Sequence, residues 1–190
     1  KTNKSKGHDT KAIAFASMSD EQLSDVLAEA GRISAGWVVA TLAYQHAFVF
    51  DAAPPNGLRC LRIGVWVKTN PMPQISADRP GQGWEAIAYM HRADVKPAWN
   101  GGGKAGNYHL PVQQRMGHPT TKPLSMLEDW VRLFTNEGQT VFDPFAGSGT
   151  TLRAAANEGR KAIGAELDER YCELIASRMA QGVLDFGGAM

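Results

Sequence analysis

A glycine-rich turn between an apolar strand and a helix is the feature that most constrains how this chain can fold. Residues 141–151 read VFDPFAGSGTT, in which small residues let a ligand approach the backbone where the strand ends. A second apolar strand, 161–166, ends in Glu166, 23 positions after Asp143. A carboxylate at this spacing is suited to accept hydrogen bonds from the hydroxyl groups of a ribose.

The turn differs from the loops that bind pyrophosphate. Dinucleotide loops carry three glycines, whereas this turn has two, Gly147 and Gly149, and no lysine follows them as in a Walker-type site. The pattern therefore favours an adenosine without a phosphate chain, and we expect S-adenosylmethionine as the cofactor. An ordinary strand-turn-helix of an α/β protein is the alternative reading, because glycine is common at such turns.

The hydrophobic pattern outside the turn predicts alternating strands and helices. Ser19 and Gln22 have the spacing of a capping box, and the apolar run 37–42 is typical of a buried strand. Further elements follow in order: a helix at 44–52, strands at 58–67 and 85–91, helices from Pro123 and at 151–158, and a last helix capped by Asp168. This alternation predicts an α/β fold with a doubly wound, mostly parallel sheet.

Length and composition indicate a globular protein in a reducing compartment. At 190 residues the chain fits one domain, and we expect 12–92, 93–117 and 118–181 to be its successive parts. No apolar run is long enough for a membrane span, and the two cysteines and five histidines lack metal-site spacing, so no metal and no membrane are expected. The net charge is only +1, but basic residues gather between His91 and Lys122. This cluster fits either phosphate contacts or a solvated loop.

Three segments resemble the amino-DNA methyltransferases. Residues 143–151, DPFAGSGTT, look like the cofactor loop of that family, and 118–123, HPTTKP, resemble the motif that precedes the loop in its circularly permuted β group. Residues 66–70, WVKTN, followed by Pro73, are similar to the strand that borders the target-base pocket in phage and prophage members. The resemblance implies a Rossmann-like methyltransferase fold in which 93–117 form a small, loop-rich recognition insert.

The resemblance also implies which residues form the site. Lys68 and Asn70 would border the target base, and Arg79, Lys104 and Arg115 would contact DNA, although a solvent-facing turn is an equal alternative for Arg79. Lys122 would approach the methionine carboxylate of the cofactor, or else be a surface charge. The implied cofactor-binding residues are Asp143, Pro144, Phe145, Ala146, Gly147, Ser148, Gly149, Thr150, Glu166, Thr120 and Lys122.

The catalytic tetrapeptide of the family, Asp/Ser-Pro-Pro-Tyr, is absent from this sequence. The only Pro-Pro pair, Pro54-Pro55, lacks the flanking polar and aromatic residues and is interpreted as a turn. In the β arrangement the motif would lie upstream of Lys1, so we expect an N-terminal catalytic segment beyond this chain.

The implied reaction is methylation of an exocyclic amine in double-stranded DNA, with adenine N6 favoured over cytosine N4. Family members often pair, which leaves a homodimer open, and a bacterial or phage-infected cytoplasm is the expected location. Two alternatives remain: a catalytically inactive, methyltransferase-like DNA-binding subunit, and a nicotinamide-linked oxidoreductase, which the two-glycine loop disfavours.

Overall fold

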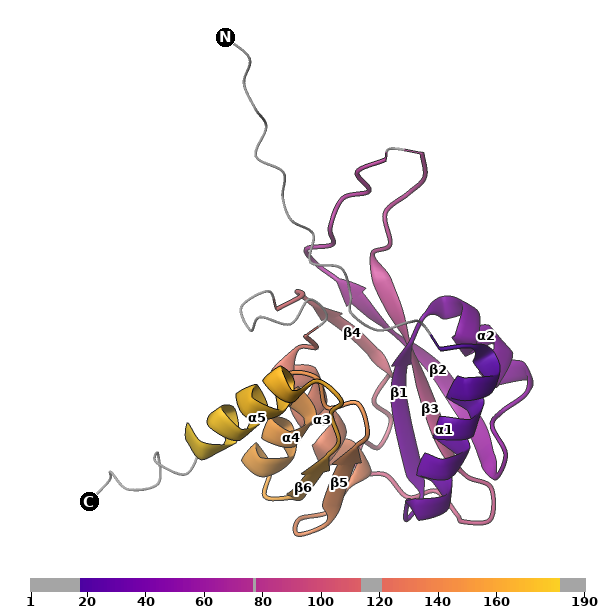
Figure 1. The fold of residues 1–190 in the computed structure, drawn as a ribbon. Coiled ribbons are helices and arrows are strands. Elements are labelled where there is room, and N and C mark those ends of the chain that lie inside the picture. The colour runs from indigo at the N-terminus through magenta and orange to yellow at the C-terminus, as the bar shows by residue number, and fades with distance from the viewer. Residues whose placement is uncertain (1–17, 77, 114–120, 182–190) are drawn as a thin grey trace.

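The fold is seen in a computed structural model that describes residues 18–76, 78–113 and 121–181 (Figure 1). Helices and strands alternate over most of this length, as predicted. In chain order the elements are α1 (Asp20–Ile33), β1 (Trp37–Leu42), α2 (Tyr44–Ala52), β2 (Leu58–Lys68), β3 (Trp84–Arg92), β4 (Asn107–Leu110), α3 (Leu124–Phe134), β5 (Thr140–Asp143), α4 (Thr150–Asn157), β6 (Lys161–Gly164) and α5 (Glu169–Gln181).

The strands form a four-stranded sheet and a separate pair. The sheet has the order β1-β3-β2-β4, with β3 antiparallel to β1 and β2, and β4 parallel to β2. The pair β5-β6 is parallel. The α/β class is as predicted, but the strand directions in the described residues are mixed rather than mostly parallel. The reason is that β2 and β3 are joined without a helix, and such a return connection makes neighbouring strands antiparallel.

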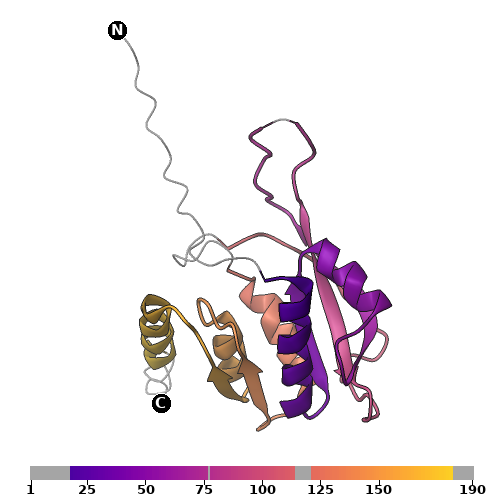
Figure 2. The same cartoon turned by 45° about the vertical axis from the view of Figure 1, so that its right-hand side comes forward.

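Both faces of the four-stranded sheet are buried, and the alternation along β3 shows how. Ile87 and Tyr89 point to a core shared with α3, whereas Ala88 and Met90 point to a core shared with α1 and α2. Successive strand residues face opposite sides, so an apolar run such as 86–90 fits a strand covered on both sides. Figures 1 and 2 show α1 and α2 on one face of this sheet, with α3 on the other.

Helix α3 connects the two sets of strands. Its residues Met126, Leu127 and Val131 are buried in the same cluster as Trp66 of β2 and Ala154 of α4. The β5-β6 pair reaches this cluster through one side chain from each strand, Val141 and Ala162. The relative position of the glycine turn and the four-stranded sheet therefore depends on how α3 is seated.

Residues 93–113, which lie within the predicted recognition insert, are attached to α3 by hydrogen bonds and an ion pair. The Tyr108 hydroxyl donates to Asp129 over 2.6 Å, and the Lys104 ammonium contacts the same carboxylate at 2.7 Å. The Asn100 amide donates to the carbonyl oxygens of Arg132 and Thr135 at the end of α3. Within this segment Asn107–Leu110 form a short strand, β4, which the sequence pattern does not reveal because four residues are too few to show a period.

The loop between β2 and β3 projects beyond the sheet in both views (Figures 1 and 2). Its exposed side chains include Met72, Ile75 and Arg79. Among the described residues, no helix combines the length and apolar character that a membrane crossing requires.

Candidate functional site: a glycine loop and a polar cleft

The glycine loop links β5 to α4 and is held by backbone bonds to the end of β6. Ala165 N donates to Asp143 O, and Ala146 N donates to Ala165 O, both over 2.9 Å. The Asp143 carboxylate accepts from Phe145 N at 3.0 Å, which turns the chain out of the strand. Gly147 and Gly149 have φ angles of 51° and 74°, which side-chain-bearing residues rarely adopt. The two glycines thus give the turn its shape.

Glu166, in the connection between β6 and α5, accepts a hydrogen bond from the glycine loop. One carboxylate oxygen accepts from Gly147 N at 2.7 Å, and the other accepts from Leu167 N and Asp168 N at 2.8 and 2.9 Å. Bonds from backbone N–H groups to a carboxylate are charge-assisted and strong. The structure therefore brings together Asp143, Gly147 and Glu166, three of the residues predicted to bind the cofactor.

Helix α5 supports the loop from behind. The Arg178 guanidinium donates to Ser148 O, and Ile175 lies where a side chain at Gly149 would project. Ser148 and Thr150 are buried, and their hydroxyls are hydrogen-bonded to each other over 3.0 Å. Phe145, which is part of the loop, is 54% exposed.

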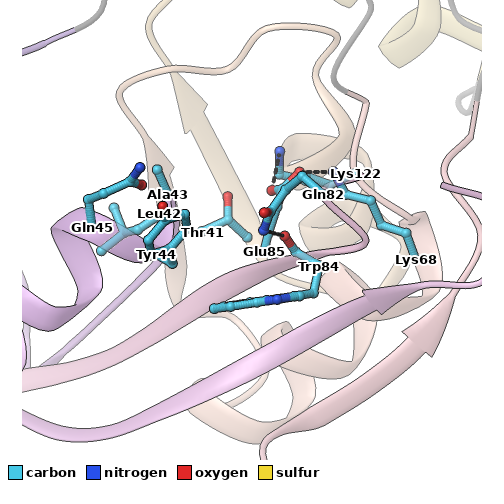
Figure 3. A pocket seen from close by; sticks show the side chains of 10 residues that line it. All are labelled: Thr41, Leu42, Ala43, Tyr44, Gln45, Lys68, Gln82, Trp84, Glu85 and Lys122. Carbon is cyan, nitrogen blue, oxygen red and sulfur yellow. Dashed lines mark hydrogen bonds and ion pairs between the residues drawn. The ribbon is translucent and has the colours of Figure 1, made fainter. Parts of the chain in front are cut away.

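A polar cleft of about 420 Å³ lies at the edge where β1 and β2 end and β3 begins (Figure 3). Two aromatic rings, Tyr44 and Trp84, form part of its wall with centroids 6.1 Å apart. Its remaining lining is mostly polar. The lining residues are Thr41, Leu42, Ala43, Tyr44, Gln45, Lys68, Gln82, Trp84, Glu85 and Lys122.

Three charged side chains meet on one side of the cleft. Glu85 contacts Lys68 at 2.9 Å and Lys122 at 3.1 Å, and dashed lines in Figure 3 mark ion pairs between these groups. Burial alone would raise the pKa of the Glu85 carboxyl, but the two ammonium groups outweigh burial and hold that pKa below its usual value. Both lysines also lie over the Trp66 ring, at 5.4 and 5.8 Å from its centroid.

The predicted site residues are only partly brought together. Lys68 and Lys122 line the cleft, as Figure 3 shows, but Asn70 does not: its amide exchanges two hydrogen bonds with the backbone of Val112. The Lys104 ammonium is paired with Asp129, while Arg79 lies on the projecting loop, 3.7 Å from Asp78. Thr120 and Arg115 lie outside the described residues.

Residues 96–177 match the family model of the N6/N4 DNA methylases. The type II methyltransferase M2.DpnII of Streptococcus pneumoniae is 31% identical over 164 residues, an alignment that covers 75% of this chain and 59% of that protein. The structure of the M1.HpyAVI-SAM complex superimposes with a TM-score of 0.73 at 27% identity, covering 83% of this chain and 82% of the other. Over the matched residues the chain resembles the amino-DNA methyltransferases in sequence and in fold.

The match to this methyltransferase family centres on the glycine-loop half. The matched range contains Lys122, the glycine loop and Glu166, whereas most of the cleft, including Tyr44 and Glu85, lies before it. The orphan methyltransferase M.BamHII of Bacillus amyloliquefaciens is 42% identical over 67 residues, which are 35% of this chain and 25% of that protein. The chain thus spans a quarter of M.BamHII and about three fifths of M2.DpnII.

Of the charged and aromatic residues of the cleft, the sequence pattern indicates Lys68 and Lys122 but not Glu85, Tyr44 or Trp84. The pattern indicates Glu85 only as the first residue of a strand, and Tyr44 only as the start of a helix. One signal was present: an acidic residue opening the apolar run 86–90 needs a partner if that run is buried. The identity of the partners, 17 residues before it and 37 after it, required the structure.

Proposed function

We propose that the protein transfers a methyl group from S-adenosylmethionine to an exocyclic amine in double-stranded DNA, with adenine N6 favoured over cytosine N4. One observation carries the proposal: Glu166 and the glycine loop are joined by the 2.7 Å bond to Gly147 N, beside an exposed Phe145 ring. This arrangement offers a carboxylate, bare backbone and an aromatic face to an adenosine, with no phosphate-binding lysine. The related M1.HpyAVI structure contains SAM.

The residues present fit that cofactor. Glu166 keeps about one of its four lone-pair sites beyond its three backbone bonds, so it can accept from a ribose hydroxyl. The electrophilic methyl group would come from the sulfonium of the bound cofactor. Asp143, Gly147 and Gly149 fix the shape of the loop that would position the cofactor. Helix α5 supports this loop through Arg178 and Ile175. Lys122 is turned to Glu85, so a contact with the methionine carboxylate would require Lys122 to share its ammonium group between the two.

The cleft is the proposed position of the target nucleotide. A base inside a duplex must be extruded to react, and such bases are commonly held by aromatic stacking and hydrogen bonds to their edges. Tyr44 and Trp84 supply the rings, and Gln45 and Gln82 supply amides that can read a base edge. Bringing the amine and the methyl group into line would then supply much of the rate enhancement.

The proposed DNA contacts are Arg79, Lys104 and Arg115. Within the described residues Arg79 is the stronger candidate, because it lies on the projecting loop with 69% of its side chain exposed and only a loose contact to Asp78. Lys104 would have to give up part of its bond to Asp129. We further propose that the protein acts on DNA in the cytoplasm and pairs as a homodimer.

A second candidate is a non-catalytic DNA-binding subunit, which is favoured by the lack of a Pro-Pro-aromatic tetrapeptide in these 190 residues. We assign no catalytic residue within this chain. The two candidates are separated by incubating the intact gene product with S-adenosylmethionine and DNA and mapping N6-methyladenine and N4-methylcytosine by sequencing. The enzyme leaves methylated sites, whereas the subunit binds both ligands without marking DNA. Calorimetric heat with a nicotinamide dinucleotide and none with S-adenosylmethionine would reject both.

A further inference from the structure

Helix α3 determines how the β5-β6 pair is positioned relative to the four-stranded sheet. The helix begins directly after Lys122, which lines the cleft. In the described residues no strand pairing joins the β5-β6 pair to the four-stranded sheet. Helix α3 packs against both, and it also packs on α4, the helix that follows the glycine loop. A small shift of α3 would therefore change the distance between the loop and the cleft.

The N-terminal end of α3 has a polar anchor in the cleft wall. Pro123 is the N-cap of α3 and offers no side-chain hydrogen bond of its own, and Lys122 directly precedes it. The Lys122 ammonium reaches Glu85 on β3, and Glu85 also holds Lys68 at the end of β2. One carboxylate thus joins three segments that are far apart in the sequence, and Figure 3 shows them converging at the cleft.

The base of this anchor is rigid. Trp66 is 1% exposed, and its indole N–H donates to Leu110 O over 2.9 Å, which fixes the ring beneath both lysines. The three charged side chains are only 19–23% exposed, so water screens their interaction less than it would on the surface. Two ammonium groups held over one ring repel each other unless an anion lies between them, and Glu85 is that anion.

We propose that Glu85 is a positioning residue for methyl transfer: by holding Lys68 and Lys122 together over Trp66, it sets the start of α3 against the cleft. This inference rests on the proposed function and adds to it a residue that contacts neither the reacting methyl group nor the amine. It acts through α3 on the alignment of the two reactants. A misplacement of about 1 Å can lower a rate about 100-fold, so the effect is measurable.

The test compares Glu85→Gln with a matched control at the other end of α3. Glu158, at the C-terminal end of α4, is 18% exposed and pairs with Arg132 of α3, so Glu158→Gln removes a carboxylate of similar burial that also pairs with a basic residue of the α3 segment. On the intact gene product, Glu85→Gln is expected to lower kcat about 10- to 100-fold while KM for S-adenosylmethionine stays within about twofold. Glu158→Gln should leave kcat within about twofold of the wild type, whatever it does to the melting temperature.

Three results would overturn the inference: an unchanged kcat in Glu85→Gln, an equal loss in Glu158→Gln, or a loss in Glu85→Gln that lies entirely in KM. Glu85→Asp covers the case in which the glutamine variant does not fold. Its shorter carboxylate keeps the charge but reaches the two lysines less well, so its kcat should fall below that of the wild type; a wild-type value would also overturn the inference. A wild-type protein that binds no S-adenosylmethionine would refute the proposed function itself, and is thereby distinguished from a failure at Glu85 alone.

Discussion

Replacing Gly149 by alanine tests whether the shape of the glycine loop depends on α5. The φ angle at this position is 74°, a left-handed conformation that costs a residue with a side chain about 1–2 kcal/mol. An added Cβ would also lie 2.8 Å from the Ile175 side chain, closer than ordinary contact. Overpacking of this kind costs about 1–3 kcal/mol, so Gly149→Ala should lower the free energy of unfolding by about 2–5 kcal/mol in total.

Gly138 provides the control, because its φ angle of 78° is nearly the same and nothing lies within 4 Å of its added Cβ. Gly138→Ala should therefore show the conformational cost alone, about 1–2 kcal/mol in urea denaturation. The double variant Gly149→Ala/Ile175→Ala should show less than the sum of its single losses, because the smaller side chain removes the clash. If Gly149→Ala and Gly138→Ala are equally destabilised, α5 does not shape the loop and the reasoning is refuted.

Three further predictions concern other contacts. Glu166→Gln removes the negative charge that accepts hydrogen bonds from three backbone N–H groups. The binding free energy for S-adenosylmethionine, measured by calorimetry, should therefore weaken by about 1.5–3 kcal/mol. An unchanged affinity would contradict the assignment of the glycine loop as the cofactor site. Asp129→Asn weakens the contacts of Tyr108 and Lys104 with α3, so the rate of amide hydrogen exchange in residues 100–110 should rise about tenfold or more. Unchanged exchange rates in the rest of the protein provide the control. The Asp129 carboxyl also has a pKa below its usual value: burial raises that pKa, but the hydrogen bonds from Lys104 and Tyr108 outweigh it. Because folding lowers the pKa values of Glu85 and Asp129, the two carboxylates stabilise the fold fully above their unfolded pKa values of 4.5 and 3.8, and this stabilisation is lost as the pH falls through the folded pKa values. The free energy of unfolding of the wild type should therefore fall more between pH 7 and pH 3 than that of Glu85→Gln/Asp129→Asn. Equal losses would count against the ion pairs of both carboxylates.

The elements that follow from local sequence were predicted closely. The capping box of Ser19 and Gln22 is present with both of its hydrogen bonds, and β1 spans the predicted residues 37–42. Capping residues and continuous apolar runs act through neighbours in the chain, so they can be recognised without a structure. The glycine loop could be predicted for the same reason, because its strand, turn and helix are contiguous.

Contacts between distant segments could not be predicted in this way. Lys104 looked like a free charge suited to a phosphate, but its partner Asp129 is 25 residues further along the chain, on α3. The connection of Lys68 and Lys122 through Glu85 likewise depends on how β2, β3 and α3 meet. Long charged side chains show no periodicity that would reveal such partners, so the sequence could identify these residues as polar but not as a group.

The side-chain amide of Asn70 pairs with the backbone of Val112 as a peptide group of a neighbouring strand would. Its oxygen accepts from Val112 N at 2.6 Å and its nitrogen donates to Val112 O at 3.3 Å, directly beyond the end of the β2-β4 ladder. The root of the projecting loop and the segment that leaves β4 are therefore fastened at a single joint. A force applied to the tip of that loop, for instance by a bound duplex, would be transmitted through this joint to the end of β4.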